Sequence, residues 1–416
     1  MRHILSRAAA TFLSSRSDKS NMNPGARNRR EAVGKSVLVI GAGVSGLTSA
    51  LCLVQKGLQA IVVADQFAPH ITSVAAGALW EWPPAVCGHH HDQVSLERSK
   101  SWCQKSYQIF AELSLDPATG VFLRPVTFYF EQPIEEIGWR RAKMDELKSK
   151  VRGFRRNPGL IAENSINPAL GLRDAYTHLA PMVDTDVYME WLLREARRSG
   201  CRIVERKITG VLRDQAAALQ RQYGVDAIVN CSGLGARELA EPSVHPLRGA
   251  LIRVRNDGKA MPRITQAHCI SHDGSNEKTG FIFIVPRGHD MLVLGGFAEP
   301  DKWGLDIGLH NYEPIREMYR RCLEFMPVLG AAEVDAAEPV RAGLRPFRHQ
   351  GVRLEREPGT PIIHNYGHSG SGVTFSWGCA FEVVDLIEDL LFNGHADASH
   401  VADMPRLTNS GFVKTP

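Results

Sequence analysis

The sequence predicts an α/β protein that combines a parallel sheet flanked by helices with a second, mainly antiparallel sheet. Near the N-terminus, an apolar run at 37–40 is followed by a helical segment at 47–55 and a second apolar run at 60–63. Such a strand–helix–strand unit is typical of parallel sheets. After about residue 245, apolar runs at 250–254, 280–285 and 291–295 follow one another without intervening helices. That order indicates antiparallel strands.

The turn between the first strand and its helix carries Gly41, Gly43 and Gly46 at G-x-G-x-x-G spacing. The first glycine permits a tight turn, the second lets the backbone approach a pyrophosphate, and the third lets the helix pack closely on the strand. The helix N-terminus then offers free N–H groups and the positive end of its dipole. Asp65 follows the second strand, near the offset of about 20 residues expected for a ribose-binding carboxylate. The stretch therefore predicts a Rossmann-like dinucleotide site.

The segment at 226–236 is again predicted as a buried strand that runs into a glycine-rich turn. A second glycine-rich loop, at 364–374, feeds a helix predicted at 377–391. A second loop of this kind favours FAD, because a dinucleotide with two large ends takes contacts from both halves of a chain. Asp65 would also suit NAD, so a pyridine-nucleotide dehydrogenase is the weaker alternative.

Periodicity predicts the remaining main elements. Helices are expected at 95–113, 135–150, 188–200 and 316–325, and strands at 121–130 and 202–204.

Composition describes an ordinary globular chain and gives no reason to expect a nucleic acid or a membrane as partner. The 416 residues are 44% hydrophobic and 23% charged, with a formal net charge of +4. No apolar run approaches the ~20 residues that span a bilayer. The eight cysteines are scattered without Cys-x-x-Cys pairs, which favours a reducing compartment, cytoplasmic or organellar, over secretion. The oligomeric state stays open, with a homodimer among the alternatives.

Residues 1–34 differ from the rest because they are rich in arginine and serine and poor in acids. That composition is typical of an organellar transit peptide. The alternatives are a disordered basic extension or a true start at Met22.

One histidine cluster raises the question of a metal site. It comprises Cys87, His89, His90 and His91. Adjacent histidines do not easily converge on one tetrahedral ion, and no second ligand cluster stands at useful spacing. We expect an exposed loop here and no metal.

The motifs, in their order along the chain, resemble the D-amino acid oxidase family of flavoproteins. They lie at 39–47, 74–77, 228–233, 343–346, 352–357 and 364–368, and together they span residues 36 to about 392. The resemblance implies a discontinuous FAD-binding domain at 35–95, 182–240 and 345–395. It implies a substrate domain at 96–181 and 241–344, followed by a polar tail at 396–416.

The resemblance also implies the residues that contact FAD. They are Ala42, Gly43, Val44, Ser45, Gly46, Asp65, Gln66, Thr72, Ser73, Ala76, Gly77, Ile208 (through its backbone), Ser232, Ser369, Gly370, Ser371, Gly372, Val373 and Thr374.

The chemistry implied by the resemblance is oxidation of an amino-acid-like small molecule. A hydride passes from the substrate Cα to the flavin, O₂ reoxidises the flavin to give H₂O₂, and the imine hydrolyses to a keto acid and ammonia. Arg345 matches the arginine that binds the substrate carboxylate. A guanidinium can hold a carboxylate in a bidentate fork, which orients the Cα–H. The competing interpretation of Arg345 is a surface ion pair.

Phe283 is the main departure from the family pattern, because it aligns with a tyrosine that also binds the carboxylate. A second active-site tyrosine has no counterpart near Thr279. These changes, together with the large aromatic side chains of Trp80 and Trp82, favour a bulkier or more apolar substrate. The aromatic residues would serve equally well as part of the protein core. Alternatives to a D-amino acid oxidase are therefore a flavin oxidoreductase for a secondary amine or biosynthetic intermediate, and a flavin-binding protein without catalysis.

Overall fold

The computed structural model describes residues 34–83, 92–270 and 281–392. The predicted extension up to residue 33, the tail at 396–416 and the Cys87–His91 cluster lie outside the described residues. Within the described part of the chain, no helix is long and apolar enough to cross a membrane. No group of histidine, cysteine and acidic side chains there could hold a metal ion.

Sheet A is the parallel sheet that the glycine motif predicts. Its strand order is β14-β15-β7-β1-β2-β6, and all pairs are parallel except β14 with β15. In the centre, Leu38 lies between Ile61 and Ile228. The strands are β1 (Ser36–Ile40), β2 (Gln59–Ala64), β6 (Arg202–Glu205), β7 (Ala227–Asn230), β14 (Arg353–Arg356) and β15 (Ile362–Tyr366).

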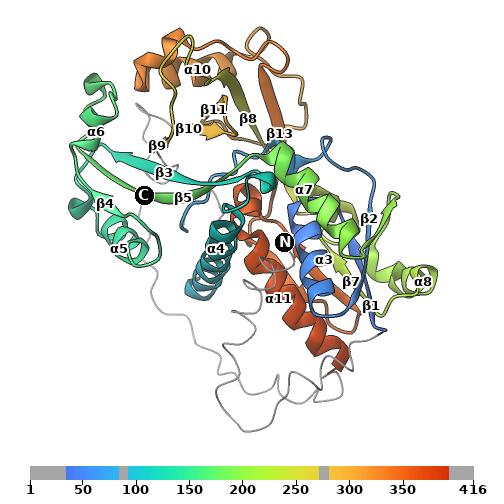
Figure 1. Ribbon diagram of the computed structural model, residues 1–416. Coiled ribbons are helices and arrows are strands. Elements are labelled where there is room, and N and C mark those ends of the chain that lie inside the picture. Colours follow the sequence, from blue (N-terminus) through green and yellow to red (C-terminus); the bar gives the residue numbers. More distant parts are fainter. Residues whose placement is uncertain (1–33, 84–91, 271–280, 393–416) are drawn as a thin grey trace.

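Helices cover both faces of sheet A, as expected for strands whose side chains are buried on both sides. Val37 and Val39 pack towards one group of helices, and Leu38 and Ile40 pack towards α8 (Leu212–Tyr223). The first group lies side by side in Figure 1 and contributes to one apolar core. It comprises α3 (Val44–Gln55), α4 (Gln93–Leu113), α7 (Thr185–Arg198) and α11 (Gly372–Phe392).

Sheet B is mainly antiparallel, as predicted, and forms the upper part of Figure 1. Its order is β12-β8-β11-β10-β9-β3-β5-β4, with β13 also paired to β8, and β3 with β9 is a parallel pair. α10 (Glu313–Phe325) packs on its apolar face. The strands are β3 (Val121–Phe130), β4 (Arg155–Arg156), β5 (Asp174–Val183), β8 (His245–Arg255), β9 (Ala267–Ile270), β10 (Ile282–Arg287), β11 (Met291–Gly295), β12 (Glu299–Pro300) and β13 (Val340–Phe347).

Most predicted elements are present, with differences at their ends. The helices predicted from 47 and 377 begin earlier, at Val44 and Gly372, because the small residues of both glycine loops already take part in the first helical turn. The predicted helix at 135–150 is shorter, α5 (Gly138–Leu147), and follows a separate 3₁₀ turn. β5 and α8 were not predicted, and neither were the strands β4, β9, β12, β13 and β14. Two short helices, α6 (Leu160–Glu163) and α9 (Ala236–Leu239), complete the set of α-helices described.

Sheet A takes its strands from three stretches of chain that lie within 35–95, 182–240 and 345–395. Sheet B takes its strands from 96–181 and 241–344, except that β5 and β13 run on to Val183 and Phe347. We propose that the two sheets mark the two predicted domains.

Candidate active site

A cavity of about 1010 Å³ lies between the two sheets. On one side it is lined by the carboxyl ends of β1, β2, β7 and β15, the edge at which α/β sheets bind ligands. On the other side it is lined by residues of β8, β10 and β13. The cavity therefore joins the two glycine loops to the antiparallel sheet.

The first glycine turn is compact because two of its glycines touch backbone atoms. Gly41 has φ +109°, and a Cβ there would lie 2.4 Å from the carbonyl oxygen of Cys231. A Cβ on Gly46 would lie 1.9 Å from the carbonyl oxygen of Gly41. The N–H of Val44, in the first turn of α3, donates to Ser73 Oγ at 3.0 Å. This turn and the 72–77 loop are thus joined at the cavity wall.

Most of the predicted cofactor residues line this cavity. They are Ala42, Gly43, Val44, Ser45, Asp65, Gln66, Thr72, Ser73, Ala76, Gly77, Ile208, Ser232, Ser369, Gly370, Gly372 and Val373.

Three predicted cofactor residues do not line the cavity. Gly46 lies in α3 against Gly41. Ser371 and Thr374 are buried in the turn and the first part of α11. A contact of these three residues with the cofactor stays a prediction.

A buried polar network supports the ends of β7 and β15 beside the cavity. Asn230 Oδ1 accepts from Ser232 Oγ at 2.7 Å. Asn365 Nδ2 donates to Ser49 Oγ at 3.2 Å, which leaves Asn365 Oδ1 to accept from His368 Nε2 at 3.0 Å. Burial lowers the pKa of His368 to about 4. Its imidazole is therefore neutral at physiological pH and serves this network.

Arg345 lies in β13 and lines the cavity. Among the described residues, its guanidinium has one hydrogen bond, from Nη1 to the carbonyl oxygen of Phe297 at 3.4 Å, and no carboxylate partner. Desolvation lowers the pKa of Arg345 to about 10, so the group is still charged at neutral pH. The surface ion pair considered as its alternative is not formed. A half-buried, desolvated cation of this kind gains most from an anionic ligand.

Phe283 lies in β10 and also lines the cavity. The two tryptophans considered with it do not: Trp80 Nε1 donates to the carbonyl oxygen of Cys103 at 3.0 Å, and Trp82 is 3% exposed. Trp80 packs edge-on against Tyr107. Both tryptophans belong to the core.

Several residues that line the cavity were not predicted as site residues. Their common feature is that sheet B brings them to the cavity from separate strands and loops, without a local motif. They include Gly249, Leu251, Phe281 and Leu305. His368 lies within the motif at 364–368. Its position beside a glycine-rich loop was the signal that could have predicted it as a site residue.

Several backbone donors of the cavity wall have no partner in the described part of the chain. Besides those of Ala42 and Gly43 in the first glycine turn, they include the N–H groups of Gly77 and Ala78, in a segment where Ala78 is buried. Because buried N–H groups are nearly always paired, they indicate a ligand with acceptors at this point.

The model of the DAO family, described as FAD dependent oxidoreductase, matches residues 36–386. The chain belongs to this family. It is an FAD-dependent oxidoreductase, which decides against the pyridine-nucleotide alternative and against a protein that only binds flavin.

Named relatives agree with this membership. The chain is 38% identical to a D-amino-acid oxidase of Rubrobacter xylanophilus over 363 residues, which are 86% of this chain and 97% of that protein. It is 30% identical to a D-aspartate oxidase of Homo sapiens over 371 residues, 85% of this chain and 94% of that protein. Among solved structures, glycine oxidase from Bacillus cereus has a TM-score of 0.64 at 19% identity and covers 85% of this chain and 96% of its own. That likeness concerns the fold.

The residues present fit FAD. The first glycine turn and the α3 N-terminus suit the pyrophosphate, Asp65 suits a ribose, and the unpartnered N–H groups of Gly77 and Ala78 suit acceptors elsewhere on the cofactor. The second loop, at the start of α11, supplies a further helix N-terminus to the same cavity.

Proposed function

We propose that this flavoenzyme oxidises the Cα–N bond of a D-amino acid with an uncharged, mainly apolar side chain, with O₂ as the electron acceptor. The observation that carries the proposal is Arg345, a desolvated cation on the cavity wall with no carboxylate partner among the described residues. An α-carboxylate has the charge and the planar shape that a guanidinium fork binds. The D configuration is supported by the names of the relatives that are 30% and 38% identical.

The surroundings of Arg345 support an apolar substrate side chain. Three apolar side chains line the same cavity: Leu251 of β8, Phe283 of β10 and Phe281, which directly precedes β10. A second carboxylate would need a second cation, because a desolvated charge without a partner costs several kcal/mol. Arg341 also lines the cavity, but its guanidinium is already held by Asp186 and by Glu338. Arg206 and Lys207 line it as well, beside Ile208 on the side predicted for the cofactor. The described residues therefore favour a neutral side chain over that of aspartate.

The division of labour follows from this arrangement. When bound, FAD supplies a two-electron acceptor for the Cα–H and returns the electrons to O₂. Arg345 holds the substrate carboxylate, and a fixed carboxylate restricts the orientation of the Cα–H. Leu251, Phe281 and Phe283 exclude water from the side chain. The substrate loses two electrons and two protons to become an imine, which water converts to a keto acid and ammonia, while O₂ becomes H₂O₂.

Phe283 favours a second candidate, a related oxidoreductase for a secondary amine or a biosynthetic intermediate. A phenyl ring cannot donate a hydrogen bond to a carboxylate, a difference of about 1–3 kcal/mol from a tyrosine whose partner stays charged. In this second candidate, Arg345 still binds an acid group, and Phe283 contacts a substituent on the nitrogen.

A substrate panel separates the two candidates. Purified protein should show a flavin spectrum, and its flavin should bleach without oxygen on addition of D-leucine, D-phenylalanine or D-alanine, with H₂O₂ formed in air. D-aspartate should react at least tenfold less efficiently. Bleaching by N-methyl amino acids such as sarcosine, without bleaching by primary D-amino acids, would establish the second candidate instead.

The Arg345→Met variant tests the proposed role of the guanidinium. Loss of a buried, charge-assisted pair should lower kcat/KM by at least about 100-fold, equivalent to ~2.7 kcal/mol, while FAD stays bound. Arg255→Met is the control, because Arg255 pairs with Asp290 and Asp335 and does not line the cavity. Activity of the Arg345 variant within threefold of the unaltered protein would contradict the assignment.

We also propose a reducing compartment, cytoplasmic or organellar. The support is that the seven described cysteines are all free and buried, and that residues 1–34 have a composition like a transit peptide. Attaching residues 1–34 to a fluorescent protein would test organellar targeting.

The oligomeric state is a separate question. Analytical sedimentation of the purified protein would decide between a monomer and a homodimer.

A further inference from the structure

The 72–77 loop on the cavity wall is held from behind by an arginine of sheet B. Arg287 ends β10 and is 4% exposed. Its Nη2 donates to the carbonyl oxygens of Ala76 at 2.9 Å and Gly77 at 3.0 Å. Its Nη1 donates to Thr185 Oγ1 at 2.7 Å. One buried side chain thus binds a loop more than 200 residues away in the sequence.

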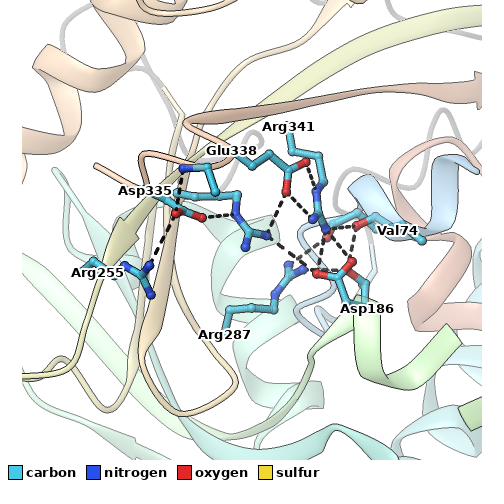
Figure 2. A network of polar contacts seen from close by, with 11 residues as sticks. Val74, Asp186, Arg255, Arg287, Asp335, Glu338 and Arg341 are labelled. Carbon is cyan, nitrogen blue, oxygen red and sulfur yellow. Dashed lines mark hydrogen bonds and ion pairs between the residues drawn. The ribbon is translucent and has the colours of Figure 1, made fainter. Parts of the chain in front are cut away.

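The same loop is held at a third carbonyl by neighbours of Arg287. Thr185 Oγ1 donates to the carbonyl oxygen of Val74 at 2.7 Å, and Arg341 Nη1 donates to it at 3.3 Å. Figure 2 shows Arg287 beside Val74, Asp186 and Arg341 within this polar network. The network connects β10, β13 and α7 to the loop.

Because each peptide unit is planar, these hydrogen bonds also fix the direction of the N–H groups on the opposite side of the loop. In a planar trans peptide, the C=O of one residue and the N–H of the next point in opposite directions. The carbonyls of Ala76 and Gly77 point to Arg287, so the N–H groups of Gly77 and Ala78 point away from it. Both residues line the cavity, and neither N–H has an acceptor in the described chain.

The charge of Arg287 adds to this effect. Its hydrogen bonds go to two carbonyl oxygens and a hydroxyl, and the carboxylates of Asp184 and Asp186 act on it through space. Burial lowers its pKa to about 10, so it remains a cation at neutral pH. A cation that donates a hydrogen bond to a carbonyl oxygen polarises the whole peptide unit. The N–H group of that peptide unit then becomes a stronger hydrogen-bond donor.

We propose that Arg287 is a positioning residue for FAD: by holding the carbonyls of Ala76 and Gly77, it aims the N–H groups of Gly77 and Ala78 at the bound cofactor. The strand that carries it also carries Phe283, which lines the cavity. Through Arg287, sheet B therefore contributes to the affinity for FAD, although Arg287 itself does not contact the cofactor. The inference depends on FAD binding alone and not on the identity of the substrate.

The test is FAD binding by the full-length protein after removal of its flavin, followed as quenching of flavin fluorescence. Arg287→Met removes the charge and all three donated bonds, and should raise the Kd for FAD at least tenfold, equivalent to ~1.4 kcal/mol. Arg287→Lys keeps the charge and part of the donor set, so it should bind FAD at least threefold more tightly than the methionine variant. At saturating FAD, the visible circular dichroism of the flavin should change in Arg287→Met, because the N–H groups of Gly77 and Ala78 are displaced.

Arg156→Met is the matched control for general destabilisation. Arg156 lies in β4 of the same sheet and pairs with the buried carboxylate of Asp174, but it does not line the cavity or contact the loop. Its loss should lower the melting temperature while the Kd for FAD stays within twofold. A Kd within twofold in Arg287→Met, or equal weakening in Arg156→Met, overturns the proposal. If the methionine variant does not fold, Arg287→Gln, which also removes the charge, takes its place: a Kd within twofold of the unaltered protein overturns the proposal, and a Kd raised at least threefold with unchanged melting temperature supports it.

Discussion

Two guanidinium groups flank the cavity, that of the buried Arg287 and that of the half-buried Arg345, and their partners distinguish their tasks. Arg287 has three close acceptors within the protein. Arg345 has one carbonyl at 3.4 Å and no carboxylate among the described residues. A desolvated charge whose own protein supplies its acceptors is part of the scaffold, whereas one with unused donors is suited to an anionic ligand. The difference at these two residues leads to opposite assignments for the same side-chain type.

Gly249 determines where the guanidinium of Arg345 lies. It belongs to β8, and a Cβ there would lie 2.0 Å from Nη1 of Arg345. We therefore expect Gly249→Ala to displace the guanidinium and raise KM for the amino acid at least tenfold, about 1.4 kcal/mol, with little change in FAD affinity. Steady-state kinetics with flavin titration measure both quantities.

Gly330→Ala is the control for this substitution, because a Cβ at Gly330 meets nothing within 4 Å. Equal KM values in the two variants would show that Gly249 has no special relation to Arg345.

At the scale of elements, the helices behind the first glycine turn pack unusually closely. Thr48 of α3 donates to the carbonyl oxygen of Ser376 of α11 at 3.3 Å, and Ser106 Oγ of α4 accepts from the N–H of Gly378 at 3.0 Å. α11 begins at the second glycine loop and α3 begins at the first. Close packing of these helices therefore sets the separation of the two loops that line the cavity.

Gly378→Ala tests the importance of that contact. In most helix interiors, alanine is more stable than glycine by about 1 kcal/mol. Here a Cβ would lie 2.3 Å from the backbone of Trp102, so the helices must separate and we expect a loss of about 1–3 kcal/mol. Urea unfolding of the holoenzyme measures it.

Gly138→Ala serves as the comparison, since a Cβ at Gly138 of α5 meets nothing within 4 Å. The prediction is wrong if Gly378→Ala is as stable as the unaltered protein or as Gly138→Ala.

At the scale of the whole molecule, burial of neutral histidines makes stability depend on pH. Burial lowers the pKa of His178 and His368 to about 4 and that of His268 to about 3. An unfolded histidine has a pKa near 6.5. Between pH 6.5 and about 4 the unfolded chain binds more protons than the folded one, so stability is retained above pH 6.5 and is lost as the pH falls.

Each such histidine contributes a slope of up to about 1.4 kcal/mol per pH unit within this window. Urea unfolding at pH 7.5, 6.0 and 5.0 should therefore show a falling free energy of unfolding. His268→Asn should flatten the slope, because the side chain no longer titrates. Constant stability from pH 7.5 to 5.0 would contradict the expectation.

The parallel sheet, the antiparallel sheet and the cofactor class could all be predicted from the amino-acid sequence. The reason is that these depend on local signals: the glycine spacing at Gly41 and Gly43, the apolar runs beside them and the second loop before α11. Most of the cofactor residues that the family resemblance implies do line the cavity. Local signals misplaced helix starts, because small loop residues carry no apolar periodicity.

The residues that meet across the cavity became known from the three-dimensional arrangement alone. It placed Trp80 and Trp82 in the core, Arg345 over Gly249, and Arg287 behind a loop 211 positions away. These relations arise from strand pairing in sheet B and from the approach of that sheet to sheet A. Periodicity reports which face of an element is buried, and it contains no information on which distant element covers that face.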